Sequence, residues 1–332
     1  MKVLITGGAG FIGMSLASRL LARGDSVVGI DNLNDYYSVR LKCDRLEKLR
    51  REGDDRFRFV EVDFANYQAL ERALADETFE RIVHLGAQAG VRYSIENPHA
   101  YVHSNLVGHL NLLETGRHRG VEHLVYASSS SVYGGNTNLP FSVSDRVDHP
   151  LSLYAATKKA DELMSETYAH LYRLPLTGLR FFTVYGPWGR PDMAMWIFTK
   201  AIFEGKPIRV FNHGRMQRDF TYIEDIVTGV ISCLDHPPAD NGAPKAGGSV
   251  APHAVYNIGN HRSEELGHMI ELIEQACGRE AIKQYEDMQP GDVPATYADI
   301  EAIKHDLGFE PKTTINEGVP RFVEWYRGYH DI

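Results

Sequence analysis

The chain has 332 residues, enough for one large domain or two ordinary ones, and its 43% hydrophobic and 24% charged residues are an ordinary globular composition. Its formal net charge of −9 argues against a diffuse basic surface of the kind that binds nucleic acid. Cys43, Cys233 and Cys277 form no C-x-x-C pair and no HExxH motif occurs, so neither a disulfide framework nor a metal site is expected. No apolar run reaches transmembrane length and the first residues read directly as a strand, so we expect a cytoplasmic protein without a membrane partner.

The first half of the chain alternates predicted strands with predicted helices. Short apolar runs predict strands at 2–6, 26–31, 57–63, 81–87, 123–130 and 175–186, and helical spacing predicts helices at 11–24, 70–77, 100–118 and 151–173. The strands are nearly all apolar, as expected where both faces of a sheet are covered. We therefore expect an α/β fold with a Rossmann-type doubly wound parallel sheet.

After residue 186 the pattern becomes irregular. It predicts a helix at 193–205, a hairpin leading into a helix at 208–226, a mobile loop at 235–253, a strand at 254–260 and a mostly helical tail at 263–332. We expect residues 1–185 to form a nucleotide-binding domain, to which segments near 223–262 return. Residues 186–332 are expected to form mainly a smaller mixed α/β domain.

The sequence GGAGFIG places Gly7, Gly10 and Gly13 between the first strand and the first helix. A tight strand-to-helix turn needs glycine for unusual φ angles and for the close approach of a pyrophosphate, which then meets the positive end of the helix dipole. Asp31 ends the second strand, 18 residues after Gly13, where a carboxylate binds an adenosine ribose and repels a 2′-phosphate. The pattern predicts a dinucleotide site that prefers NAD to NADP, with Asp63 placed to meet the adenine.

The stretch LSLYAATKKADEL carries Tyr154 one turn before Lys158, so the two side chains share a helix face. By spacing alone, a half-buried tyrosine beside a solvated lysine is the more common explanation. The alternative is a phenol that a neighbouring cation makes more acidic and that serves as a base. The spacing itself leaves both explanations open.

Six segments that run through most of the chain resemble the extended short-chain dehydrogenase/reductases of the nucleotide-sugar epimerase and dehydratase group. They are TGGAGFIG, HLGAQAGVRYSIENP, ASSSSVYG, YAATK, RFFTVYGPWGRPDMA and RDFTYIEDI. Within the group the chain most resembles the UDP-glucuronate 4-epimerases, with one small departure at Gly86, where relatives usually have alanine. The resemblance implies a tightly bound NAD that is recycled in each turnover, a UDP-sugar substrate, and a homodimer formed through the helices at 100–118 and 151–173.

The resemblance also assigns catalytic and cofactor-binding residues. Tyr154 and Lys158 would lie under the nicotinamide ring, where the two positive charges favour the phenolate, and Ser129 would hydrogen-bond the reacting oxygen. The implied cofactor site consists of Gly7, Gly10, Phe11, Ile12, Gly13, Asp31, Asn32, Asp63, Phe64, Leu85, Ala87, Tyr154 and Lys158. Ser129, Tyr154 and Lys158 are therefore the expected catalytic residues.

Two groups of residues bear on the substrate. Ser130 and Ser131 stand where sugar 4,6-dehydratases carry an Asp-Glu pair and where decarboxylases usually have a glutamate, which argues against water elimination and, more weakly, against decarboxylation. Arg190 is expected to border the sugar pocket, where a guanidinium suits a uronate carboxylate. The implied substrate-binding residues are Arg92, Ser129, Ser130, Tyr154, Thr183, Arg190, Arg209, Arg218 and Asp292.

Together these features predict the interconversion of UDP-glucuronate and UDP-galacturonate, in a pathway that makes surface polysaccharide. The predicted steps are NAD-dependent oxidation at C4, rotation of the 4-keto sugar and reduction from the opposite face. Three alternatives stay open at this point: a UDP-glucose/UDP-galactose 4-epimerase, a UDP-glucuronate decarboxylase, and a non-catalytic redox sensor that binds NAD.

Overall fold

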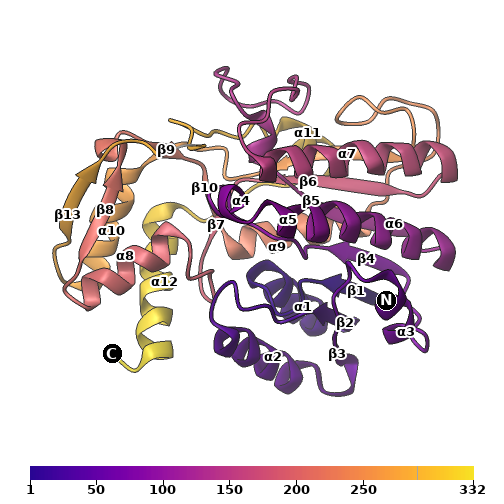
Figure 1. Ribbon diagram of the computed structural model, residues 1–332, viewed down its shortest axis with the longest axis horizontal. Coiled ribbons are helices and arrows are strands. Elements are labelled where there is room, and N and C mark those ends of the chain that lie inside the picture. The colour runs from indigo at the N-terminus through magenta and orange to yellow at the C-terminus, as the bar shows by residue number, and fades with distance from the viewer. Residues whose placement is uncertain (290) are drawn as a thin grey trace.

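A seven-stranded parallel sheet lies at the centre of the computed structural model, which describes residues 1–289 and 291–332 (Figure 1). Its strands are β1 (Lys2–Thr6), β2 (Ser26–Asp31), β3 (Phe57–Glu61), β4 (Arg81–His84), β5 (His123–Ser129), β6 (Leu176–Phe181) and β11 (His253–Ile258). They lie in the order β11-β6-β5-β4-β1-β2-β3, so the chain builds outward from β1 to β3 and then crosses back to β4. This confirms the expected α/β fold with a Rossmann-type doubly wound sheet.

Helices cover both faces of this sheet. They are α1 (Phe11–Arg23), α2 (Val39–Gly53), α3 (Tyr67–Ala73), α6 (Gly108–Arg119), α7 (Leu153–Tyr172) and α9 (Ile223–Asp235). Val3 and Ile5 of β1 belong to one buried cluster with residues of α1 and α9, whereas Leu4 belongs to another with residues of α6 and α7. Successive strand residues point to opposite faces of the sheet, and both faces are buried under helices. This explains the nearly unbroken apolar runs of the strands.

Two helical regions differ from the expectation. The helix expected at 100–118 is divided into α5 (Pro98–Tyr101), a π-helical turn η2 (Val102–Val107) and α6, and a short helix α4 (Tyr93–Glu96) precedes it. The helix α2 was not expected, although Ser38 caps it by accepting a hydrogen bond from Leu41 N at 3.4 Å. Two 3₁₀ turns, η1 (Asp54–Arg56) and η3 (Ser130–Tyr133), follow α2 and β5.

Beyond β6 the remaining elements are mostly gathered at one end of the sheet, at the left of Figure 1. They are β7 (Thr183–Tyr185), α8 (Ala194–Phe203), β8 (Pro207–Phe211), η4 (Asn212–Gly214), β9 (Gln217–Arg218), β10 (Phe220–Tyr222), β12 (Glu264–Glu265), α10 (Leu266–Cys277), β13 (Ile282–Glu286), α11 (Glu301–Leu307) and α12 (Ile315–His330). There α10 packs against α8 and α12, and short strands pair in twos.

The prediction of a hairpin within residues 208–226 is wrong. The strands β8, β9 and β10 pair with three different partners, namely β13, β12 and β7, rather than with one another. Asn212 and His213 both have positive φ, so a turn does follow β8, but it sends the chain away from that strand. Most of the partner strands come from much later in the chain, and local hydrophobic pattern carries no information about them.

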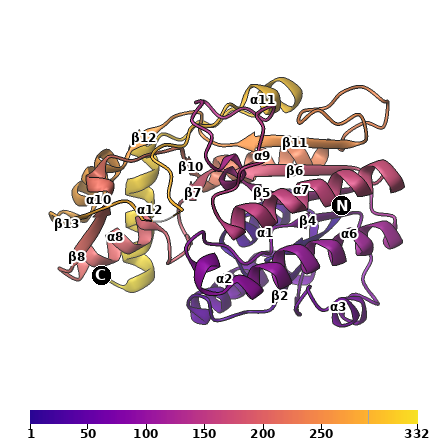
Figure 2. The same cartoon turned by 45° about the horizontal axis from the view of Figure 1, so that its top comes forward.

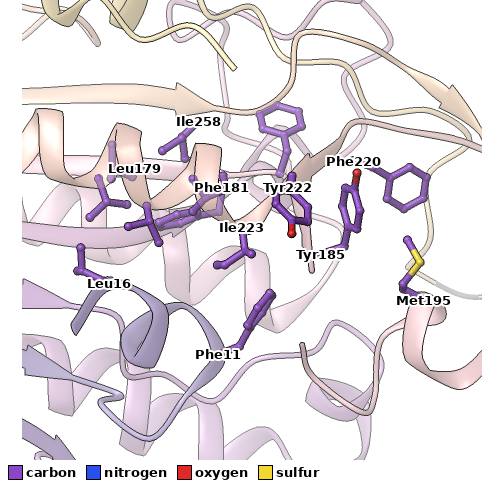
Figure 3. Close-up of a cluster of buried hydrophobic side chains, with 14 of the residues drawn as sticks. Phe11, Leu16, Leu179, Phe181, Tyr185, Met195, Phe220, Tyr222, Ile223 and Ile258 are labelled. Atoms are coloured by element: carbon purple, nitrogen blue, oxygen red, sulfur yellow. The ribbon is translucent and has the colours of Figure 1, made fainter. Parts of the chain in front are cut away.

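One buried hydrophobic cluster connects the sheet with this smaller part (Figure 3). It includes Leu179 of β6 and Ile258 of β11 on the sheet side, and Tyr185, Met195 and Phe220 on the other. The chain also crosses between the parts, since α9 packs against α1 and β11 pairs with β6. The continuous core holds the two parts in a fixed relation, and a domain boundary at residue 185 stays a prediction.

The segment at 235–253 is a loop, and it is tied to the sheet side by its own contacts. Arg173 pairs with Asp240, and Ser249 Oγ donates to Glu166 Oε1 at 2.8 Å. Among the described residues, no helix is both long and apolar enough to cross a membrane, and no group of three or more His, Cys, Asp or Glu side chains could hold a metal ion.

Candidate active site

The turn between β1 and α1 contains glycines at positions where there is no room for a side chain. Gly7 has a φ of +68°, and a Cβ there would lie 2.9 Å from the backbone nitrogen of Gly86. A Cβ at Gly13 would lie 2.1 Å from the carbonyl oxygen of Gly7, and one at Gly10 would lie 2.9 Å from the same atom. Since α1 begins without a side-chain cap, its first N–H groups are available to an anion at this bare turn.

Asp31 closes the other side of the glycine turn. Its Oδ2 accepts a hydrogen bond from Ala9 N at 3.3 Å, and its Oδ1 accepts one from Leu33 N at 2.9 Å. Each carboxylate oxygen keeps acceptor capacity for a further donor such as a ribose hydroxyl. Lys42, which the sequence did not single out, lines the same cavity and donates to the carbonyl oxygen of Asn34 at 2.6 Å.

The predicted catalytic residues come together in that cavity. Ser152 caps α7 by accepting a hydrogen bond from Ala155 N at 3.1 Å, and the helix then places Tyr154 and Lys158 one turn apart. Ser129 ends β5, where its Oγ accepts a hydrogen bond from Ser131 N at 3.1 Å and still has its own proton to donate. Ser129, Tyr154 and Lys158 all line the cavity that begins at the glycine turn.

Most of the other predicted cofactor residues line this cavity as well. These are Gly7, Gly10, Phe11, Ile12, Gly13, Asp31, Asn32, Phe64, Leu85 and Ala87. Asp63 is not among the described residues that line the cavity. Its carboxylate instead accepts a hydrogen bond from Ala65 N and lies 3.1 Å from His103 Nε2. Its contribution to cofactor binding stays a prediction.

Arg190 also lines the cavity, but it already has a partner that the sequence analysis missed. Its Nε donates to Asp192 Oδ1 at 3.0 Å and its Nη2 donates to Asp192 Oδ2 at 2.5 Å. The Tyr36 hydroxyl donates a third hydrogen bond to the Asp192 carboxylate, to Oδ2 at 3.2 Å. Burial and, to a smaller extent, the negative charge of Asp192 raise the pKa of Tyr36 to about 12. Burial alone would raise the pKa of Asp192, but Arg190 holds it below its ordinary value. Asp192 thus binds the guanidinium of Arg190 along its Nε and Nη2 edge.

A buried arginine joins the glycine turn to the loop that carries Arg190. Arg45 Nη1 donates to the carbonyl oxygen of Ala9 at 3.0 Å, and its Nη2 donates to those of Trp188 and Gly189 at 2.6 and 3.0 Å. Its side chain is fully buried. The only sequence signal for it was its place on the apolar face of α2. We infer that Arg45 keeps the two cavity walls at a fixed distance.

Four of the remaining predicted substrate contacts form a second group, outside the described residues that line the cavity. Arg92 Nη2 donates a hydrogen bond to Asp292 Oδ2 at 2.7 Å. Burial lowers the pKa of Arg218, the charge of Asp292 opposes this change, and the charge of Arg92 adds to it. Arg209 pairs with Glu286, and the guanidinium groups of Arg92 and Arg209 both lie over Phe211. Ser130 and Thr183 are not among the described residues that line the cavity, although their sequence neighbours Ser129 and Val184 are.

The chain is similar along most of its length to several known proteins. Residues 4–322 match the family model described as GDP-mannose 4,6 dehydratase. The chain is 56% identical over 335 residues to protein CapI of Staphylococcus aureus, with 99% of each chain covered. It is 48% identical over 332 residues to a probable UDP-glucuronate 4-epimerase of Rhizobium meliloti, covering 98% of this chain and 97% of that one. The crystal structure of a UDP-glucuronic acid 4-epimerase from Bacillus cereus, in complex with UDP-glucuronic acid and NAD, matches with a TM-score of 0.88 at 32% identity, covering 99% of this chain and 100% of that one.

A doubly wound sheet with this glycine turn, and with a Tyr-x-x-x-Lys helix beside it, makes the chain an extended short-chain dehydrogenase/reductase. Its motifs predicted a narrower membership, which the family model and the relatives now confirm. The chain belongs to the nucleotide-sugar epimerase/dehydratase family.

Proposed function

We propose that the protein interconverts UDP-glucuronate and UDP-galacturonate by oxidation at C4, rotation of the 4-keto sugar and reduction from the opposite face. The observation that carries the proposal is that Tyr154, a base for the C4 hydroxyl, and Arg190, a cation suited to a uronate, line one cavity. The relatives from Rhizobium meliloti and Bacillus cereus, whose names state this activity, support it.

The residues present fit NAD. The Cβ distances leave no room for a side chain at Gly7, Gly10 or Gly13, so a pyrophosphate can approach the N-terminus of α1. Asp31 would hold the adenosine ribose, and Lys158 would hold the nicotinamide ribose. When bound there, NAD would supply the hydride acceptor and donor of the cycle and would be unchanged after it.

Tyr154, Ser129 and Lys158 divide the work at C4. The phenol oxygen of Tyr154 takes the proton of the C4 hydroxyl during oxidation and returns a proton during reduction. Ser129 Oγ donates a hydrogen bond to the reacting oxygen in both directions. The positive charge of Lys158, one helical turn away, stabilises the phenolate form of Tyr154.

Arg190 would recognise the carboxylate that distinguishes a uronate from a neutral sugar. Asp192 occupies the Nε and Nη2 edge of the guanidinium, and no described residue accepts a hydrogen bond from Nη1. Because a guanidinium carries five N–H donors in a rigid plane, the Nη1 side can bind a second carboxylate. Asp192 would then aim Arg190 rather than compete with the substrate.

The alternative reactions have less support. Ser130 and Ser131, after the end of β5, cannot act as carboxylic acid catalysts, although the matching family model carries the name of a dehydratase. This argues against water elimination and more weakly against decarboxylation. A neutral-sugar epimerase would need no cation at position 190.

The direct test incubates the purified protein with UDP-glucuronate, with and without added NAD⁺, and follows the sugars by NMR. We expect UDP-galacturonate with no build-up of free NADH. Formation of UDP-xylose would instead assign a decarboxylase. Failure with UDP-glucuronate together with conversion of UDP-glucose would assign a neutral-sugar epimerase.

A homodimer formed through α6 and α7 is part of the proposal. The two helices lie side by side on the outer face of the sheet (Figure 2). On α7, Leu163 and Leu171 are 58% and 61% exposed, and Val107 and Leu110 are exposed on the neighbouring η2 and α6. Large apolar side chains gathered on adjacent helices are typical of protein–protein contacts.

Leu163→Lys is expected to convert the dimer to a monomer, because the contact would have to bury an unpaired charge. Size-exclusion chromatography with light scattering gives the mass directly. Ile282→Lys is the matched control, since Ile282 is 57% exposed on β13, a strand that lies at the opposite end of the molecule from α6 and α7 (Figure 1). A monomeric wild type, or a dimeric Leu163→Lys variant, would show that these helices do not form the contact.

A further inference from the structure

The lysine of the active site has a buried partner that the family motif does not contain. Lys158 Nζ lies 3.1 Å from Asp161 Oδ2, and the two side chains are only 3% and 1% exposed. Asp161 Oδ1 is buried and has no hydrogen-bond partner among the described residues. An under-satisfied buried carboxylate costs stability, so its presence beneath the cavity calls for a reason.

The surroundings leave Asp161 as the counter-charge of Lys158. Ionisable groups face this region from α7 itself and from several of the strands and helices around it. They are Glu162 and Tyr154 on α7, His84 on β4, His109 on α6, Tyr126 on β5, Arg180 on β6, His253 on β11 and Tyr101 on α5. Burial lowers the pKa of His84 to about 3 and that of His109 well below its usual value, so both are neutral. Glu162 is held by Arg180, with N–O distances of 2.8 and 3.0 Å.

We propose that Asp161 is a positioning residue that competes with the Tyr154 phenolate for the charge of Lys158. Lys158 stands between the two along α7. Tyr154 precedes it by four residues and lines the same cavity, and Asp161 follows it by three residues and contacts its Nζ. An ionised Asp161 neutralises the lysine and makes the phenolate less stable. A protonated Asp161 leaves the full charge of Lys158 to the phenolate. The catalytic relevance of this competition rests on the proposed function.

The competition falls in the range of pH in which an enzyme works. Burial raises the pKa of Asp161 to about 7, against the opposing effect of Lys158. As the pH rises, whichever of Tyr154 and Asp161 ionises first makes the second hold its proton more tightly, because the two anions share one cation. By linkage the effect is reciprocal, so neutralising the first group must lower the midpoint of the second.

Two titrations of the NAD-loaded protein test this without any substrate, so that a wrong substrate assignment cannot disturb them. The ultraviolet difference spectrum between the wild type and Tyr154→Phe follows the ionisation of Tyr154 in the wild type. The difference spectrum between Asp161→Asn and the double variant Asp161→Asn/Tyr154→Phe follows the ionisation of Tyr154 when Asp161 is neutral. Infrared spectra against Asp161→Asn follow the carboxyl of Asp161, in the wild type and in Tyr154→Phe. We expect at least one midpoint to fall by about one pH unit when the other group is neutralised.

Glu166→Gln removes a carboxylate from the same helix without touching Lys158, since Glu166 contacts His253 and Ser249. It should leave the Tyr154 midpoint where it is in the wild type. Unchanged midpoints for both Tyr154 and Asp161 would overturn the proposal and make Asp161 a structural residue. If Asp161→Asn does not fold, Asp161→Ser replaces it in both titrations, because it also removes the carboxylate. A lower midpoint for either group then supports the competition, and unchanged midpoints for both oppose it.

Discussion

Tyr154→Phe is expected to reduce epimerisation by about a thousandfold or more while leaving NAD binding intact. The phenol is the group proposed to take the C4 proton, and a positioned acid–base group contributes about 10²–10⁴-fold to a rate. Phenylalanine keeps the aromatic ring and hence the edge contact with Tyr101, whose ring centre lies 6.1 Å away. Product formation from UDP-glucuronate and the NAD content of the purified variant measure the two effects separately.

Tyr172→Phe is the matched control for this variant. It removes a hydroxyl from the other end of the same helix, where Tyr172 is 45% exposed, and it should keep wild-type activity. Activity of Tyr154→Phe within tenfold of the wild type would mean that another group moves the proton. A wild type that binds NAD but turns over no UDP-sugar would instead favour the non-catalytic redox sensor.

The sheet and the glycine turn could be predicted because their signals are local. Each strand of the first half is a short apolar run, and Gly7, Gly10 and Gly13 stand directly between the first strand and the first helix. The pairing of β8 with β13 could not be predicted, since it joins residues more than seventy positions apart in two parts of irregular pattern. Sequence pattern locates strands, whereas their partners depend on the whole fold.

The candidate site shows the same division. Ser129, Tyr154 and Lys158 stand in recognisable motifs, and the structure brings them into one cavity. Asp161 lies three residues after Lys158, a helical spacing at which two side chains meet, so its contact had a signal that was overlooked.

Arg45 shows the other limit, because its partners are distant in sequence. It bonds to Ala9 on one side and to Trp188 and Gly189 on the other, and only the folded chain brings these together. Arg92 and Asp292 were each expected to contact substrate, and the structure pairs them across 200 positions. Sequence spacing does not encode a pairing over such a distance.

The proposed intermediate makes a strict demand on the pocket. A 4-keto uronic acid is a β-keto acid, and it loses CO₂ readily when the breaking bond lies parallel to the carbonyl π system. An epimerase must therefore hold the carboxylate near the carbonyl plane throughout the rotation of the sugar. Arg190 is suited to this task because Asp192 and Tyr36 fix its guanidinium from behind.

Arg190→Ala is therefore expected to lower kcat/KM for UDP-glucuronate by about 100-fold, the effect of losing charge-assisted hydrogen bonds worth about 1.5–3 kcal/mol. The residual turnover should leak toward UDP-pentose, which NMR separates from UDP-galacturonate. Arg146→Ala is the matched control, since Arg146 forms an ion pair with Asp148 at the same two-residue spacing but is 92% exposed. Wild-type activity and product ratio in Arg190→Ala would contradict the role of this arginine, and full activity on UDP-glucose alone would place the protein among the neutral-sugar epimerases.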